Sequence, residues 1–143
     1  MAVQTESGNF HQQLAKLRTR YEKRLRATAK LSVQKTVKTA QTVTKEGGRM
    51  RVKTGFLWHS ISANIGALPV GESSPAFEDE YYTYTGAEVA SVIIRWNLDE
   101  VLYIGWLASY ARPREHFDGF VKGATENWQE TVAEMAKKVN KHI

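Results

Sequence analysis

Three short motifs in the first half of the chain contain residue types that could perform acyl transfer. Ser32 and Lys35 are spaced as S-x-x-K, Ser62 and Asn64 as S-x-N, and Lys53 begins a K-T-G. In serine penicillin-recognising enzymes these motifs supply the nucleophile, the base and a substrate-binding strand. Those enzymes place K-T-G last and need a second subdomain, whereas here K-T-G precedes S-x-N in a chain of 143 residues. We therefore predict that the protein is not an enzyme.

The other reactive side chains do not form a recognisable site either. Asp99 and Glu100 are neighbours in a predicted tight turn, so their carboxylates point apart. Gly47-Gly48 lacks the spacing of a phosphate-binding loop, and the absence of cysteine excludes disulfides and thiolate metal sites. The histidines show no metal-ligand spacing: His11, His59, His116 and His142. We expect no catalytic, cofactor-binding or metal-binding residues, and no cofactor.

The length of the chain fits one domain, and we predict a single α+β domain over residues 1–143. Apolar residues recur every three or four positions from Phe10 to Val43 without Gly or Pro, which predicts a long basic helix over about 10–46. A small antiparallel sheet with an acidic loop should follow over about 50–106, and a long C-terminal helix over about 115–141. The first residues lack the features of a signal peptide and no apolar run could cross a bilayer, so we expect a soluble protein without a membrane partner.

The middle of the chain alternates turn signals with short apolar runs. Thr54 and Gly55 precede an apolar segment, which predicts a short helical turn with Thr54 as its N-cap. A strand is predicted from the alternation of Ile61, Ala63 and Ile65. Residues 66–80 are rich in Pro, Gly and Ser and predict a long loop. Two or three more strands are expected, the last two joined as an antiparallel hairpin by a tight reversal at 97–100: 81–85, 89–96 and 101–106.

Charge is divided unequally along the chain. Residues 1–71 contain 13 Lys and Arg against 3 acids, and residues 72–143 contain 7 against 12, so the halves carry about +10 and −5. Such a division suggests a polyanion partner or subunits whose opposite sides attract each other. The first helix carries a basic face that is either solvated or faces phosphates or a neighbouring subunit: Lys16, Arg18, Arg20, Lys23, Arg24, Arg26, Lys30, Lys35 and Lys38. The loop contributes a candidate inter-subunit acidic segment: Glu78, Asp79 and Glu80.

The four tryptophans are the remaining unusual feature: Trp58, Trp96, Trp106 and Trp128. A large aromatic side chain in a strand or helix usually lies in the core, but aromatic residues are also enriched in oligomer contacts. Trp106 and the nearby Tyr110 precede an Arg-Pro-Arg segment, and they are the best candidates for interface aromatics.

Residues 51–61, Arg51-Val52-Lys53-Thr54-Gly55-Phe56-Leu57-Trp58-His59-Ser60-Ile61, carry a likeness to a known family. They resemble the T-G-x-L-x-x-S-I signature of the neck or tail-completion proteins of tailed bacteriophages, which include the minor tail protein Z of lambda. The resemblance to this family continues at residues 103–105 and 110–112. It also includes two aromatic residues of the predicted final helix, Phe120 and Trp128. With the long first helix, the resemblance covers nearly the whole chain.

The resemblance implies a structural ring subunit at the head-to-tail junction of the virion, made in the host cytoplasm. Its expected partners are further copies in a cyclic ring, a hexamer or a dodecamer, the connector or stopper and tail-tube or terminator proteins, and DNA held without sequence readout. In that family context Thr54 would cap the short helix, Gly55 would permit a tight turn, and Leu57 and Ile61 would fix the helix to the sheet. A tail terminator and a head-side adaptor or stopper remain alternatives within the junction. A stand-alone, non-specific nucleic-acid-binding protein is the alternative outside it.

Overall fold

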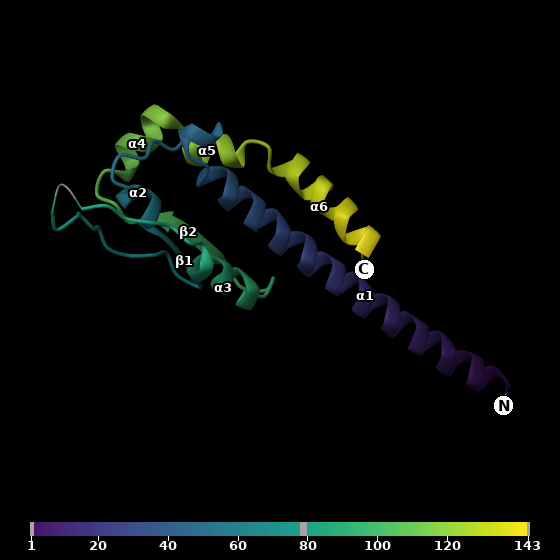
Figure 1. Cartoon of the computed structure of the whole chain (residues 1–143). Coiled ribbons are helices and arrows are strands. Elements are labelled where there is room, and N and C mark those ends of the chain that lie inside the picture. Colours follow the sequence, from purple (N-terminus) through teal and green to yellow (C-terminus); the bar gives the residue numbers. More distant parts are fainter. Residues whose placement is uncertain (1, 78–79, 143) are drawn as a thin grey trace.

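One long helix organises the molecule (Figure 1). The computed structural model describes residues 2–77 and 80–142, with side chains from residue 8 onward. Helix α1 spans Ala2–Ala40, and one 3-10 turn, η1, follows at Thr44–Glu46. The prediction therefore placed the start of this helix at about residue 10 instead of Ala2, and its end at about residue 46 instead of Ala40. After the helix ends, Val43 and Met50 form an isolated parallel bridge, and Gly47-Gly48 lie in the loop between them.

The sheet has two antiparallel strands, and the predicted α+β class with a long first helix and a C-terminal helix is confirmed. Strand β1 is Ile61–Ile65 and strand β2 is Leu102–Trp106, with Ile61 opposite Trp106 and Ile65 opposite Leu102. Both strands were predicted at these places. The predicted partner of β2 was wrong, because β2 pairs with β1 and not with residues 89–96.

Residues 89–96, predicted as a strand, belong to helix α3, Ala87–Arg95. Val89, Val92 and Ile93 are buried together at helical spacing, while Ile94 is exposed. This one-sided burial is the physical reason for the helix, since a strand would alternate its sides. The predicted reversal exists, with the Glu100 amide donating to the Asn97 carbonyl at 3.0 Å, but it joins a helix to a strand.

Residues 81–85, also predicted as a strand, form no strand with any of the residues that the structure describes. The Tyr82 amide donates to the Thr54 carbonyl at 2.7 Å, and the other backbone groups of this segment make no ladder in the described part of the chain. The segment thus lies against the start of the short helix α2, Phe56–His59, without extending the sheet.

The predicted C-terminal helix over 115–141 is divided into three helices: α4 at Ala111–Asp118, α5 at Phe120–Thr125 and α6 at Trp128–His142. Gly119 ends α4 with a φ of 64°, a left-handed conformation that glycine adopts without strain. The Glu115 carboxylate then accepts hydrogen bonds from the amides of Val121 and Lys122 at 2.8 and 2.9 Å. These bonds satisfy donors at the start of α5 that have no partner inside the helix.

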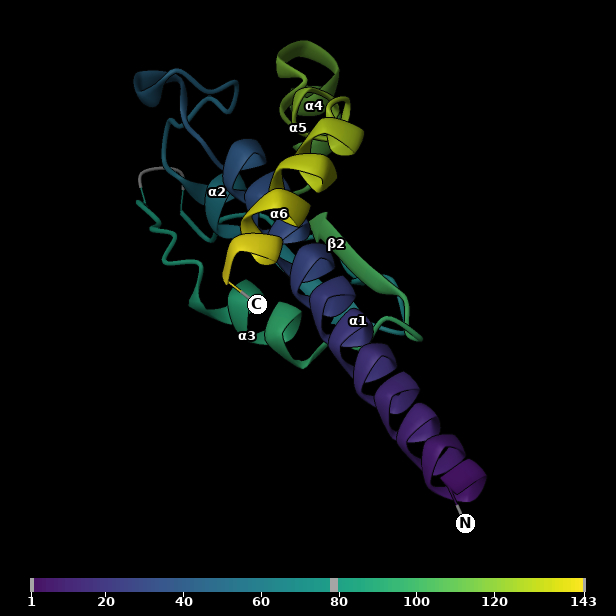
Figure 2. The ribbon, with the colours of Figure 1, turned by 90° about the vertical axis from the view of Figure 1, so that its right-hand side faces the viewer.

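Two apolar clusters hold the elements together. The first contains Met50, Phe56, Leu57, Ala108 and Phe120, and the second contains Val37, Ile61, Val89 and Ile93. Helix α6 lies along α1 and buries its own Met135 and Val139 (Figure 2). Within residues 2–77 and 80–142, no helix has the length and apolar character needed to span a membrane.

An ion pair between Lys35 of α1 and Glu134 of α6 strengthens the contact of these helices. The hydrogen bond from Lys35 and its positive charge lower the pKa of Glu134 below its ordinary value of 4.5. A carboxyl group with a lowered pKa in the folded state stabilises the fold above its unfolded pKa and loses this effect as the pH falls through its folded pKa.

We therefore expect Glu134→Gln to lower the free energy of unfolding slightly at pH 7, and this difference to vanish well below the ordinary pKa of 4.5. Both groups are solvent-accessible, so added salt should reduce the difference. Urea unfolding of both chains at pH 7 and pH 3 measures it, with Glu130→Gln on the same helix as the matched control. A difference that is equal at both pH values would contradict this role of the ion pair.

Candidate assembly surfaces

The N-terminal half of α1 carries an apolar stripe that no element within residues 2–77 and 80–142 covers. Its members recur every three or four residues and are between 46% and 67% exposed: Phe10, Leu14, Leu17, Tyr21 and Leu25. We call these five residues the α1 stripe. The helical spacing of apolar residues continues beyond it to Val33 and Val37, which pack against the second cluster. Apolar periodicity thus runs along the whole helix, but the body of the chain covers only its C-terminal half.

The α1 stripe is uncovered because α1 extends past the rest of the molecule. Both views show the N-terminal half of α1 projecting beyond the end of α6 and beyond the sheet (Figures 1 and 2). An amphipathic helix is normally stabilised by packing its apolar side against another element. A contiguous run of exposed large apolar residues is typical of a surface that contacts another molecule.

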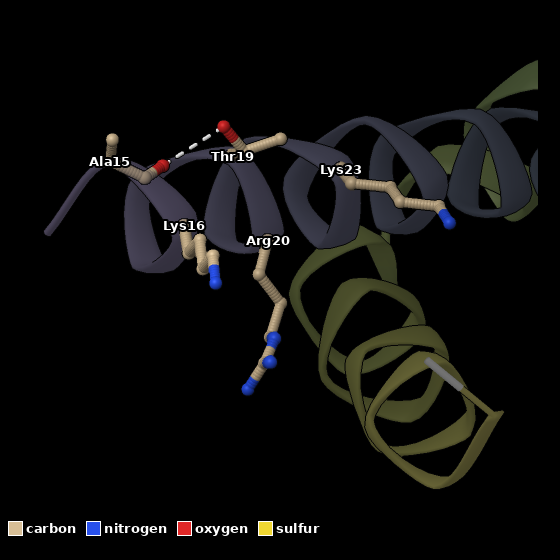
Figure 3. A pocket seen from close by; sticks show the side chains of 5 residues that line it. All are labelled: Ala15, Lys16, Thr19, Arg20 and Lys23. Carbon is tan, nitrogen blue, oxygen red and sulfur yellow. Dashed lines mark hydrogen bonds between the residues drawn. The ribbon is translucent and has the colours of Figure 1, made fainter. Parts of the chain in front are cut away.

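The basic residues of the projecting segment gather mainly on the side of α1 away from the stripe. Lys16, Arg20 and Lys23 extend around a shallow hollow that Ala15 and Thr19 also line (Figure 3). The Thr19 hydroxyl donates to the Ala15 carbonyl at 2.9 Å, so it is occupied within the helix. None of these five residues is acidic, and the hollow is a positively charged surface open to solvent.

Arg18, Arg24 and Arg26 complete the basic part of the projecting segment. Arg18 contacts Glu22 at 3.2 Å and Arg26 contacts the same carboxylate at 3.9 Å, both one turn away on the exposed helix. Such exposed pairs contribute little to stability. Arg24 is half-buried. The positive charge of this segment therefore exceeds what its one acid, Glu22, neutralises.

Two further residues of the predicted basic face bind other elements of the chain. Lys30 donates to the Ile94 carbonyl at 2.5 Å and so joins α1 to the end of α3. Lys35 pairs with Glu134 of α6. Lys38 is exposed near the end of α1. Of the predicted basic face of α1, the accessible residues therefore lie mainly within residues 16–26.

The loop after β1 presents a second set of exposed apolar residues. Leu68, Val70, Phe77 and Tyr81 are between 65% and 85% exposed, and Glu72 and Glu80 add exposed carboxylates. We call these six residues the loop surface. Two of the predicted acidic residues, Glu78 and Asp79, lie outside the described residues.

The loop is tied to the body of the molecule. The Ser73 amide donates to the Leu107 carbonyl at 2.7 Å, and the Ser109 amide donates to the Ser73 carbonyl at 2.9 Å. The hydroxyl groups of Ser74 and Ser109 lie 3.0 Å apart. These bonds hold the backbone in place while the apolar side chains point to solvent, so the loop surface is presented on an anchored segment.

The signature segment 51–61 forms a tight turn into α2. Gly55 has a φ of 84° and is the residue that precedes the helix, so the prediction that Thr54 is the N-cap was wrong. The Thr54 hydroxyl instead accepts a hydrogen bond from the Phe56 amide at 3.3 Å, two residues later. Leu57 and Ile61 are both buried, Leu57 in the first cluster and Ile61 in the second.

Gln41 connects the end of α1 to both halves of the core, and sequence reasoning missed it. Its side-chain amide donates to the Trp58 carbonyl at 2.8 Å, and its side-chain oxygen accepts from the Trp106 indole at 2.8 Å. The Trp58 indole donates to the Gln41 carbonyl at 3.0 Å. A buried glutamine after a long helix offers no pattern that would reveal these partners.

Replacement of Gln41 by leucine is expected to lower the free energy of unfolding by about 2 kcal/mol, because the Trp106 indole N–H loses its acceptor in a partly buried site. Chemical unfolding measured by tryptophan fluorescence tests this. Gln129→Leu, the same exchange at an exposed position of α6, is the control and should change stability by less than about 0.5 kcal/mol. Equal effects of the two replacements would show that the Gln41 hydrogen bonds contribute nothing.

The predicted interface aromatics lie mainly against their own chain. Trp106 packs edge-to-face on Phe120, with ring centroids 5.1 Å apart. Tyr110 is half-buried near Phe56 and lines an open groove together with Arg51 and Arg114. Burial raises the pKa of the Tyr110 phenol above its ordinary value. Trp106 also lines an open hollow, between α1 and α5, together with Val37 and Ala124.

Residues with possible chemical roles are separate in space or occupied. Ser32 is fully buried, and its hydroxyl donates to the Thr28 carbonyl at 2.7 Å. The described part of the chain contains no group of three or more His, Asp or Glu side chains that could hold a metal ion. The chain matches no protein-family model, and it has no significant match among curated proteins or solved structures.

Proposed function

We propose that the protein is a non-enzymatic ring subunit of the head-to-tail junction of a tailed bacteriophage, where it joins the head connector to the tail around the DNA channel. The α1 stripe is the observation that carries the assembly part of this proposal, since it leaves an amphipathic helix without a partner. The resemblance of residues 51–61 to the neck-protein signature supports the phage part.

The charge distribution supports a ring with DNA inside it. In a cyclic ring one side of each subunit meets a different side of its neighbour, so a basic half and an acidic half on one chain are complementary. The basic hollow formed by Lys16, Arg20 and Lys23 suits contact with phosphates without base readout. On this proposal the ring is a hexamer or a dodecamer, and it acts either as a tail terminator or as a head-side adaptor or stopper.

The proposal is tested by complementation in extracts. Cells infected with a phage that lacks this gene should accumulate filled heads and tails that do not join. Addition of the purified chain should then restore infectious particles, and electron microscopy of the separated particles should show which side the protein joins. Full infectivity without the chain, or no restoration by folded protein, would contradict the proposed role.

The basic hollow favours one second candidate function, stand-alone non-specific binding of nucleic acid. That function predicts a duplex affinity whose logarithm falls steeply with the logarithm of salt concentration, with a slope of about −0.9 for each phosphate contacted. Lys16→Gln, Arg20→Gln and Lys23→Gln together should then reduce the slope by about 3, whereas Lys137→Gln on α6 is the control. Weak binding that barely depends on salt would remove this candidate.

A further inference from the structure

The structure presents two exposed apolar surfaces that differ in the charge around them. The α1 stripe lies on a segment where basic residues outnumber acids, and the loop surface includes the carboxylates of Glu72 and Glu80. From this complementarity we infer that the α1 stripe of one copy binds the loop surface of a second copy. The inference rests on the proposed ring, and it specifies which surfaces of the subunits meet.

The two surfaces cannot meet within one chain. The N-terminal segment of α1 projects from one end of the molecule, and the described residues of the loop after β1, 66–77 and 80–81, extend toward the opposite end (Figure 1). The serine contacts around Ser73 and Ser109 hold the loop on the body, and the C-terminal half of α1 is packed against α6 and the sheet. A contact between the α1 stripe and the loop surface therefore requires two molecules.

Pairing of two α1 stripes with each other is disfavoured by their sequence. Phe10, Leu14, Leu17 and Tyr21 follow the four-and-three spacing of a coiled-coil seam, but Arg24 occupies the next seam position. The seam is thus limited to about two heptads, fewer than the three or four typical of a coiled coil. Two copies of this segment would also place the Arg18 side chain that borders one stripe beside a second helix segment of net positive charge, and like charges repel each other.

The loop surface removes both difficulties. At about 100° of rotation per residue, Arg18 lies beside the α1 stripe on the exposed part of the helix, where it can approach a carboxylate beside an apolar contact. Glu72 and Glu80 supply such carboxylates next to Val70 and Tyr81 in the loop. Because the contact joins two different surfaces, a pair of copies retains one free α1 stripe and one free loop surface. Repetition then gives a closed ring or a filament.

The absence of cysteine from the chain permits a direct test by engineered cross-linking in the full-length protein. Leu17→Cys is placed in one preparation, and Val70→Cys or Phe77→Cys in another, and the two are mixed and treated with a short bismaleimide. We expect covalent dimers that contain one chain of each kind. Gln12→Cys, an exposed position on the opposite side of α1, is the matched control and should give at least tenfold less product with either loop variant.

Three results would overturn the inference. The first is a predominance of Leu17→Cys dimers formed with each other, which would show pairing of two α1 segments. The second is equal cross-linking of Gln12→Cys and Leu17→Cys. The third is no cross-link to either loop position at protein concentrations at which the wild-type chain is oligomeric or fully bound to phage particles.

The test also separates this inference from the proposed function. A chain that restores infectivity in extracts but gives no cross-link from Leu17→Cys to the loop overturns the contact and leaves the junction role standing. A chain that cross-links as expected but does not restore infectivity supports the contact and counts against the junction role.

Discussion

A Gly55→Ala chain is expected to lose about 3 kcal/mol of folding free energy, enough to unfold a marginally stable domain at moderate temperature. Two causes act together. Gly55 has a φ of 84°, a left-handed conformation that costs an alanine about 1 to 2 kcal/mol. A Cβ atom at this position would also lie 2.2 Å from the Tyr82 carbonyl oxygen, which is backbone and cannot rotate away.

The clash would separate two segments that are now joined. The Tyr82 amide donates to the Thr54 carbonyl at 2.7 Å, and movement of residues 81–85 away from Gly55 would weaken that bond. The Tyr82 ring also packs edge-to-face on Phe56, with centroids 5.0 Å apart. Gly55 therefore stabilises the fold by allowing close contact between the signature segment and the chain that follows the loop.

Gly66→Ala is the matched control for Gly55→Ala. Gly66 has nearly the same φ, 86°, but a Cβ atom there would meet nothing within 4 Å. This replacement should cost only about 1 kcal/mol, the penalty of the left-handed conformation alone. Thermal unfolding of both variants separates conformational strain from steric conflict. If both lose the same stability, the close approach to Tyr82 has no energetic role.

Replacement of three residues of the α1 stripe by glutamine, Leu14→Gln, Leu17→Gln and Tyr21→Gln, is expected to abolish assembly while leaving the fold intact. The three residues are at least 46% exposed, so their replacement removes little buried surface from the single chain. Glutamine is a good helix former, so the free energy of unfolding of the monomer should change by less than about 0.5 kcal/mol. Native mass spectrometry and binding to phage particles should both show the loss.

Ala15→Gln together with Thr19→Gln is the control for the stripe variant. These positions lie on the side of α1 that faces the basic hollow and carry the same new residue type on the same segment (Figure 3). The control chain should assemble like the wild-type chain. Assembly by the stripe variant at wild-type concentrations would contradict the role of the exposed apolar residues.

Much of the fold could be predicted because local patterns determine it. The helical recurrence of apolar residues in α1 and the period-two alternation at Ile61–Ile65 were sufficient to predict both elements. Helix α3 was mistaken for a strand because Val and Ile favour strands, although their burial at 89, 92 and 93 follows the helical period. The pairing of β2 with β1 joins segments far apart in the chain, and no local pattern specifies such a partner.

The assembly surfaces could be predicted only in part for the same reason. The residues of the basic face were visible in the sequence, but the contacts of Lys30 with α3 and of Lys35 with α6 depend on how the helices pack. The spacing of the stripe indicated an apolar side of α1, but sequence does not reveal that the body ends before this side is covered. The role of Gln41 likewise depends on two tryptophans brought together by the tertiary fold.

If this chain is an assembly subunit of a phage junction, as we propose, its native mass should reveal that role. The mass should be measured for the purified protein alone and after mixing with purified tails and with DNA-filled heads. We predict a discrete ring-sized oligomer, or a monomer that migrates together with one of the two particles. A monomer at all concentrations that joins neither particle would contradict the account.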